Sequence, residues 1–419
     1  MVGRRTQRGF REAEKPETGT IFKNGFPSSP TGDPELAQTR TITRKKLAAL
    51  GVLSFASRTL HGLYRPPPAR AGVPKSFLVV EPWGIGDVVL STALLKALRA
   101  NFPDASITLL AKPHAQQLLE HSRLADQIVA FDFPWTAFSG KFSPVKYAPR
   151  EFQDLIRRLR SYDFDVSIDA RRDIRSNVIT YLAGARRRIG YDFGGGGHLL
   201  TDVLPSGAQD DHKISDWLAL LKPLGIAQLD HYLPSLVVTH AEKELARQQI
   251  DALGFSFDRP IVGIHPGASH VVRHWDAGKF ASVIDRVVGD LKAQVLVFEE
   301  KKGDSAAIAS YNRVPRIQSD LRGFMALVAQ CDLLLCSDSG PMHIANALNV
   351  PVTALFGPQR REWYGPRGDR DRVVQVDDMP CRPCFDACIF ATPRCMDGVT
   401  VDAVVSAIED QLERLARTG

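Results

Sequence analysis

The chain has 419 residues, enough for two domains of ordinary size, each with its own core. Apolar residues make up 44% and charged residues 24%, the composition of a soluble globular protein, and no apolar run is long enough to cross a bilayer. The net charge of +6 suits an enzyme that handles phosphorylated substrates or works beside an anionic membrane; together with a basic N-terminus it is too weak a sign to indicate a nucleic-acid partner.

Residues 1–74 differ in composition from the rest and form an N-terminal extension. The first forty are rich in Arg, Lys, Gly, Pro and Thr and predict disorder. The segment 44–64 is basic at its start and then apolar, which predicts a short helix. Such a helix either lies on a membrane surface or docks on the body of the protein, and the sequence leaves both open. A cleavable signal peptide is not expected, because the apolar run 47–56 starts far from Met1.

Strand-like and helix-like patterns alternate through the remainder of the chain and predict an α/β fold with parallel sheets. We expect two Rossmann-like domains facing each other across a cleft, over 75–238 and 239–419, the second ending in a helix at 401–415. The predicted strands are 77–80, 107–110, 128–131, 166–169, 261–264, 294–298, 333–336 and 352–356. Loops that follow the strands should face the cleft, where open parallel sheets bind ligands.

The most informative loop reads S-D-S-G-P-M-H-I-A at 337–345, between a buried strand and a helix. Backbone N–H groups at such a helix N-terminus bind anions, above all phosphate. Because Pro341 has no N–H, we expect Ser339, Gly340 and Met342 to be the donors. Helix capping by Asp338 or Ser339 is the simpler alternative.

Two further loops carry unusual chemistry. G-I-G-D at 84–87 lacks the third glycine of a dinucleotide site, and its Asp87 either caps a helix or presents a carboxylate to the cleft. H-P-G-A-S at 265–269, with Arg273 nearby, is a weak phosphate signal by itself.

Taken together, in this order and spacing, the three loops resemble the bacterial heptosyltransferases, the glycosyltransferases of family nine. The resemblance covers roughly 76–415 and is most specific at 337–358; a D-A-x-x-x-x-R-S segment at 169–176 adds to it. It implies a GT-B enzyme that transfers a sugar, typically heptose from ADP-heptose, with inversion onto a lipopolysaccharide-core acceptor.

The resemblance also implies roles for individual residues. Asp87 falls on the catalytic base. The donor phosphates would be held by Ser269, Arg273, Asp338, Ser339, Gly340, Met342 and His343. Acceptor-side candidates are Gly86, Arg171, Arg172 and Arg175, with His212 and Lys213 as weaker ones; a solvated basic helix start is the alternative for the arginines.

No metal or other cofactor is expected for the chemistry. Helix N–H groups and Arg273 can stabilise the leaving diphosphate while Asp87 takes the hydroxyl proton. We interpret the D-x-D triplets at 163–165 and 369–371 as structural. The cysteine-rich loop 381–395, with Cys381, Cys384, Cys388 and Cys395, is compact enough for a structural zinc or iron–sulfur site, but two disulfides or reduced thiols fit equally well.

The expected partners are a nucleotide-sugar donor, a lipid-linked glycan acceptor and, through 44–64, an anionic membrane, which would place the protein in the cytoplasm at the inner face of the cytoplasmic membrane. Two alternatives remain open. One is a transferase of the same fold that uses another nucleotide sugar in capsule or other surface-polysaccharide assembly, since the loop 299–304 departs from the family pattern. The other is a non-catalytic sugar-nucleotide-binding protein.

Overall fold

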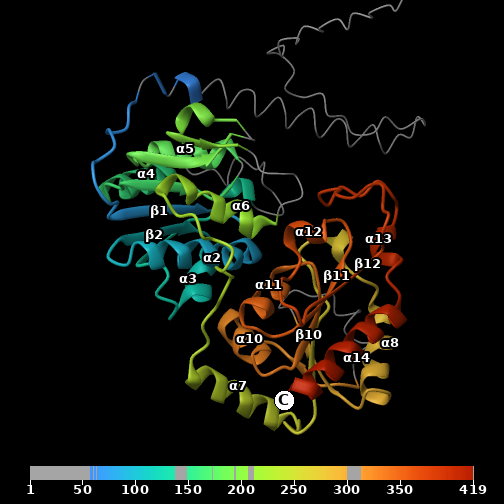
Figure 1. Ribbon diagram of the computed structural model, residues 1–419. Coiled ribbons are helices and arrows are strands. Elements are labelled where there is room, and N and C mark those ends of the chain that lie inside the picture. The colour runs from blue at the N-terminus through green and yellow to red at the C-terminus, as the bar shows by residue number, and fades with distance from the viewer. Residues whose placement is uncertain are drawn as a thin grey trace, which may run out of the picture.

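The computed structural model describes residues 57–59, 61–62, 64–136, 149–171, 173–192, 195–205, 212–299 and 313–418. Two six-stranded sheets, parallel throughout, organise these residues, and helices cover both faces of each (Figure 1). Their strand orders are β3-β2-β1-β4-β5-β6 and β12-β11-β10-β7-β8-β9. The carboxyl ends of the central strands β1, β4, β7 and β10 therefore supply the loops from which a site can be built.

The first sheet and its helices occupy the N-terminal half. Its strands are β1 (Ser76–Glu81), β2 (Ser106–Ala111), β3 (Gln127–Ala130), β4 (Val166–Asp169), β5 (Arg187–Tyr191) and β6 (Asp202–Leu204). Its helices are α2 (Ile85–Asn101), α3 (His114–Leu119), α4 (Pro149–Ser161), α5 (Ile174–Leu182) and α6 (Lys213–Ala219).

The second sheet and its helices follow. The strands are β7 (Ile261–His265), β8 (Gln294–Phe298), β9 (Arg316–Ile317), β10 (Leu333–Ser337), β11 (Val352–Phe356) and β12 (Arg372–Gln375). The helices are α7 (His240–Ala252), α8 (Ala277–Gly289), α10 (Leu321–Val328), α11 (Gly340–Ala347), α12 (Arg361–Tyr364), α13 (Arg394–Asp397) and α14 (Val401–Thr418).

Strand alternation builds a core on each face of both sheets. In β1, Phe77 and Val79 enter the apolar cluster that contains α2, whereas Leu78 and Val80 enter the one that contains α4 and α5. Successive side chains of a strand point to opposite faces, so continuous apolar runs are what a sheet covered on both sides requires. The runs at 77–80 and 333–336 could be recognised in the sequence for this reason.

The two domains share apolar contacts. Helix α2 lies beside α11 (Figure 1), and Ile344 and Ala347 of α11 belong to the same buried cluster as the core of the first sheet. Arg322 of α10 adds a polar connection: it donates to the Gln117 carbonyl at 3.3 Å and pairs with Glu242 of α7 at 2.6 Å. The starts of α2 and α11 are thereby held close to each other.

The end of the predicted helix 44–64 docks on the first domain. The Tyr181 hydroxyl donates to the Tyr64 carbonyl, the two rings meet edge to face with centroids 5.6 Å apart, and the Arg160 guanidinium covers Tyr64 at 4.4 Å. His61 stacks on Tyr181, and Ser57 is hydrogen-bonded to His198 at 3.2 Å. Ser57, His61 and Tyr64 therefore dock on the first domain; residues 1–56, 60 and 63 lie outside the described part of the chain.

Every strand predicted from the sequence is present. The prediction omitted β5, β6, β9 and β12, of which β5 begins with two arginines and β12 is half-buried throughout. Within the described ranges, the helices are all too short or too polar to cross a membrane.

Candidate active site between the domains

Asp87 lies in the first turn of α2, where the loop after β1 turns into the helix. Its Oδ2 accepts a hydrogen bond from the Gly84 N–H at 3.3 Å, and its Oδ1 lies 2.6 Å from Nη1 of Arg171. Arg171 follows β4, the neighbour of β1 in the sheet. The predicted base and a predicted acceptor-side arginine thus form an ion pair, which holds the carboxylate in one orientation.

The turn after β10 places an open helix N-terminus near this carboxylate. Ser339 is the N-cap of α11 in extended conformation, and its hydroxyl donates to the Ser337 carbonyl at 3.1 Å instead of capping the helix. Within the described residues, no hydrogen bond uses the N–H groups of Ser339 and Gly340. Both remain candidate phosphate donors.

Met342, the third predicted donor, has its contacts within the second domain. Its N–H already donates to the Ser339 carbonyl at 3.2 Å, because the first turn of α11 is tight, and its side chain is fully buried in the core of the second domain. Met342 therefore anchors the helix, and a ligand role for it stays a prediction.

Arg273 lies where a phosphate-binding cation was predicted, but carboxylates surround it. Nε and Nη2 donate to the two oxygens of Asp386 at 2.7 and 2.8 Å, and Nη1 lies 3.2 Å from Oδ2 of Asp338. Burial lowers the pKa of Arg273, but the two carboxylates outweigh burial and raise it above its ordinary value. Ser269, in the same loop, is exposed.

Asp338 connects the two halves of the site electrostatically. Burial raises its pKa to about 6; Arg273 opposes this shift, and the charges of Asp386 and Asp87 add to it. A carboxylate of one domain thus affects the titration of a carboxylate in the other. The Tyr364 hydroxyl lies within the field of the same groups, and burial raises its pKa above the ordinary value.

Gly86 and His343, predicted for the acceptor and donor sides respectively, contact each other. A Cβ added to Gly86 would lie 2.5 Å from Cδ2 of His343, so α2 can approach α11 only with glycine at this position. Burial lowers the pKa of His343 to about 4, and the imidazole is neutral at physiological pH. In this arrangement both residues serve the domain contact, and a ligand role for them stays a prediction.

A cavity of about 170 Å³ opens beside the Asp87–Arg171 pair. Both domains line it, with Trp83, Ala170, Arg171, Asp173, Tyr191, Lys213, Asp216 and Trp217 from the first and Tyr364 from the second. Lys213, one of the two weaker acceptor-side candidates, lines this cavity and lies 2.9 Å from Asp216. The aromatic residues were not predicted, because nothing in their local sequence distinguishes them from core residues.

The other acceptor-side candidates have different neighbours. Arg175 pairs with Asp173, the N-cap of α5, and Arg172 lies outside the described residues. His212 caps α6, and its Nε2 is hydrogen-bonded to the Gly365 carbonyl of the second domain at 3.0 Å. His212 therefore takes part in the contact between the two domains.

The four clustered cysteines are free thiols, so the disulfide alternative is not realised. No three histidine, cysteine or acidic side chains within the described ranges are arranged to hold a metal ion. A structural metal at this loop stays a prediction without geometric support.

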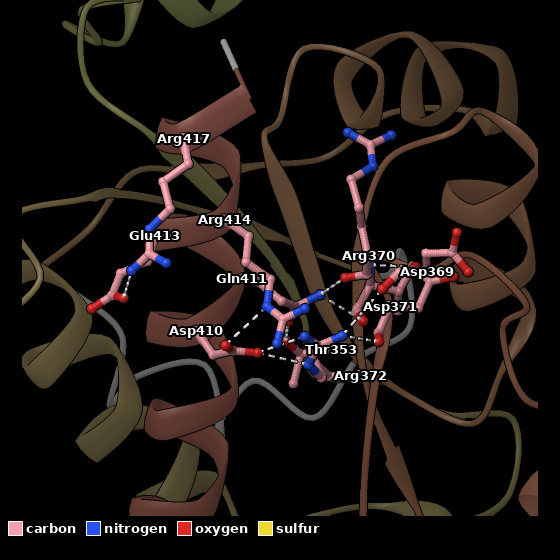
Figure 2. A network of polar contacts seen from close by, with 11 residues as sticks. Thr353, Asp369, Arg370, Asp371, Arg372, Asp410, Gln411, Glu413, Arg414 and Arg417 are labelled. Atoms are coloured by element: carbon pink, nitrogen blue, oxygen red, sulfur yellow. Dashed lines mark hydrogen bonds and ion pairs between the residues drawn. The ribbon is translucent and has the colours of Figure 1, made fainter.

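Both D-x-D triplets have structural contacts, as predicted. Asp163 pairs with Arg186 at 2.7 Å, and Asp165 accepts the Lys75 N–H at 2.8 Å. Asp371 accepts the Val352 N–H at 2.9 Å, which fixes the start of β11. Figure 2 shows the surrounding network, in which neighbours of Asp371 join α14: Arg372 pairs with Asp410 at 2.6 Å and Gln411 donates to the Arg370 carbonyl at 2.7 Å.

Solved structures share this architecture. The chain is similar to the glycosyl transferase family 9 protein from Veillonella parvula DSM 2008, with TM-score 0.70 and 19% identity, covering 83% of this chain and 99% of that one. It is also similar to E. coli heptosyltransferase WaaC with ADP-2-deoxy-2-fluoro heptose, with TM-score 0.58 and 17% identity, covering 80% and 99%. These likenesses define the fold as GT-B, two Rossmann-like domains with a cleft between them.

Sequence comparison identifies the family. The chain is 26% identical to lipopolysaccharide heptosyltransferase 2 of Escherichia coli (strain K12) over 317 residues, which is 71% of this chain and 87% of that protein. The model of glycosyltransferase family 9 (heptosyltransferase) matches residues 152–392, more than half of the chain. The protein belongs to this family, as the sequence motifs predicted.

Proposed function

We propose that this glycosyltransferase transfers heptose from ADP-heptose to a lipopolysaccharide-core or related surface-glycan acceptor, with inversion and without a metal ion. The names of its relatives support the sugar and the acceptor, and the ADP-heptose analogue in WaaC supports the nucleotide. The observation that carries the proposal is the placement of the Asp87 carboxylate beside an open helix N-terminus of the other domain. A Cβ on Gly340 would lie 3.1 Å from Cγ2 of Ile85, and the charge of Asp87 acts on Asp338.

The proposed mechanism is a single displacement. Asp87 accepts the proton of the acceptor hydroxyl as that oxygen attacks the anomeric carbon, and the diphosphate leaves with the bonding electron pair. The negative charge that develops on the diphosphate is stabilised by the N–H groups of Ser339 and Gly340 and by Arg273. Attack from the side opposite the leaving group inverts the anomeric carbon.

The acceptor would occupy the 170 Å³ cavity beside Arg171. Its walls combine the rings of Trp83, Trp217 and Tyr364 with the Lys213–Asp216 pair. Aromatic faces suit the apolar side of a sugar ring, and the charged pair can exchange hydrogen bonds with hydroxyl groups.

A donor panel tests this function. The protein would be incubated with ADP-heptose, a UDP-hexose or a GDP-sugar, each with core glycan and with EDTA or Mg²⁺. Of these donors, we expect only ADP-heptose to raise the unfolding temperature through binding. With acceptor present it should release ADP, at the same rate in EDTA as in Mg²⁺. Selective protection and transfer with another nucleotide sugar would favour the alternative in capsule assembly, and strict dependence on Mg²⁺ would contradict the metal-free mechanism.

We also propose that the protein contacts the inner face of the cytoplasmic membrane through 44–56, which is basic and then apolar. The docked residues Ser57 and Tyr64 follow this segment and bind the first domain. Removing 1–56 should leave transfer to a delipidated acceptor unchanged and abolish binding to anionic vesicles. Equal vesicle binding by the full-length and shortened proteins would refute the contact.

A further inference from the structure

Three charged side chains meet at the carboxyl ends of β1 and β4. Glu81 is the last residue of β1, Arg171 follows β4, and Asp87 lies in the first turn of the helix after β1. Because the two strands are adjacent and parallel, their ends lie at the same edge of the sheet. The Arg171 N–H donates to Oδ1 of Asp169 at 2.9 Å, which fixes the start of the loop that carries the guanidinium.

One nitrogen of Arg171 serves both carboxyl groups. Nη1 lies 2.6 Å from Oδ1 of Asp87 and 3.7 Å from Oε1 of Glu81. The indole rings of Trp83 and Trp217 lie 4.9 and 5.9 Å from the guanidinium carbon, so the aromatic groups also restrict its position.

Glu81 is an unusual residue for this position, because its side chain is completely buried. Its Oε1 accepts the Trp83 N–H at 3.3 Å, while Oε2 has no hydrogen-bond partner among the described residues. Burial raises the pKa of Glu81 to about 8 against the opposing charge of Arg171, so the carboxyl is protonated at neutral pH. Arg171 then has Asp87 as its ionised partner.

We propose that Glu81 and Arg171 are positioning residues for Asp87. Protonated Glu81 lies against Nη1 of Arg171 without competing for its charge. Arg171 therefore pairs with the Asp87 carboxylate and fixes its orientation. When Glu81 ionises, it attracts the same Nη1 and draws the guanidinium away from Asp87. Asp169 faces Glu81, and Tyr364 faces Arg171. The other titratable groups close enough to interact with Asp87 are Lys112, His114, Asp338 and His343. This inference rests on the proposed function only in the role it gives to Asp87.

The first test measures activity. Glu81→Gln keeps the shape of a protonated glutamic acid, so turnover near pH 7 should stay within about threefold of the wild type, whose turnover should fall as the pH rises through about 8. In Glu81→Gln this alkaline limb should disappear. Arg171→Met should lower kcat by roughly 10- to 100-fold, the effect of a misplaced catalytic group, with the affinity for ADP unchanged. Arg157→Met, at an exposed position of α4, is the matched control.

The second test needs no substrate. A raised folded-state pKa means that the folded protein holds the Glu81 proton more tightly than the unfolded one. Its contribution to stability is therefore lost progressively as the pH rises from about 4.5, the ordinary value, to about 8. The unfolding temperature of the wild type should fall between pH 5 and pH 8 more steeply than that of Glu81→Gln. Glu409→Gln, the same change at an exposed position of α14, should behave as the wild type.

The two tests separate the possible failures. An alkaline limb unchanged in Glu81→Gln, or full activity in Arg171→Met, overturns the positioning role. Should Asp87→Asn retain turnover while the two stability curves still differ, the assignment of Asp87 as the base is wrong, whereas the buried titration of Glu81 stands.

Discussion

Each side of the cleft holds one arginine between two carboxyl groups, but the two arrangements differ in charge. Arg171 lies between Asp87 and Glu81, whose pKa burial raises to about 8, so at neutral pH it has one ionised partner. Arg273 lies between Asp386 and Asp338, whose pKa is raised only to about 6, so it has two. The acceptor side is therefore balanced in charge and the donor side carries an excess of negative charge.

This difference indicates how each arginine works. Arg171 pairs with one carboxylate, that of Asp87, and orients it. Arg273 is held by partners that compete with an incoming diphosphate, so the backbone N–H groups of Ser339 and Gly340 must contribute a large part of phosphate binding. Donor affinity should then respond to pH and to the carboxylates around Arg273.

The largest effect in this comparison is expected from removing the donor-side arginine. Arg273→Ala should weaken ADP binding by about 1.5 to 3 kcal/mol, the range for hydrogen bonds to charged groups, whereas Arg171→Ala should leave it unchanged. Calorimetry of both variants in EDTA measures this. Equal losses in the two variants would show that the arginines do not divide the work as proposed.

The next effect concerns the domain contact. Gly86→Ala places a methyl group against the ring of His343 and should destabilise the protein by about 1 to 3 kcal/mol, with reduced turnover. The double variant with His343→Ala should recover most of the loss. Gly289→Ala, in α8 with no atom within 4 Å of the added Cβ, is the control. No loss in Gly86→Ala would mean that α2 and α11 are further apart than described.

A smaller effect follows from Asp338. Because its pKa is raised to about 6, it becomes protonated as the pH falls through that value and then no longer opposes a bound phosphate. Affinity for ADP-heptose should rise by roughly three- to tenfold between pH 8 and pH 5.5, which corresponds to about 1 kcal/mol of partly screened repulsion. In Asp338→Asn this dependence should be absent. The same slope in wild type and variant would assign the titration to another group.

The smallest effect concerns the buried histidines at the domain boundary. Burial lowers the pKa of both His212 and His343 to about 4, so each contributes stability that is lost as the pH falls from about 6.5 towards 4. His212→Asn keeps an N-cap acceptor for α6 and should flatten this decline by a few degrees in unfolding temperature. His240→Asn, at an exposed position, should not flatten it.

Much of the fold was predictable because buried parallel strands are continuous apolar runs. The run at 261–264 has no polar interruption, the run at 352–356 has only Thr353, and both were placed correctly. Strand β5 was missed because it begins with two charged residues, Arg187 and Arg188. Their guanidinium groups bind Asp202 and backbone carbonyls, which allows the arginines to lie within a strand. The spacing of apolar residues in a sequence cannot show which groups such arginines bind.

The motifs located the site but not its charge balance. Asp87 and the 337–345 turn could be identified because the spacing of glycine, aspartate and apolar residues is informative by itself. The partner Asp386 is 113 residues from Arg273 in the sequence, and Glu81 directly follows the apolar run 77–80. Such pairs are brought together by the topology of the two sheets, and each would have looked like an isolated surface or core residue.

The most direct test of the account is the turnover of Asp87→Asn. This variant keeps the size of the side chain and removes its ability to accept the hydroxyl proton, so kcat should fall by roughly 10² or more while the affinity for ADP-heptose stays within about twofold. Single-turnover transfer to core glycan, measured beside calorimetry of donor binding, gives both quantities. Near-normal kcat in Asp87→Asn would contradict the assignment of Asp87 as the general base.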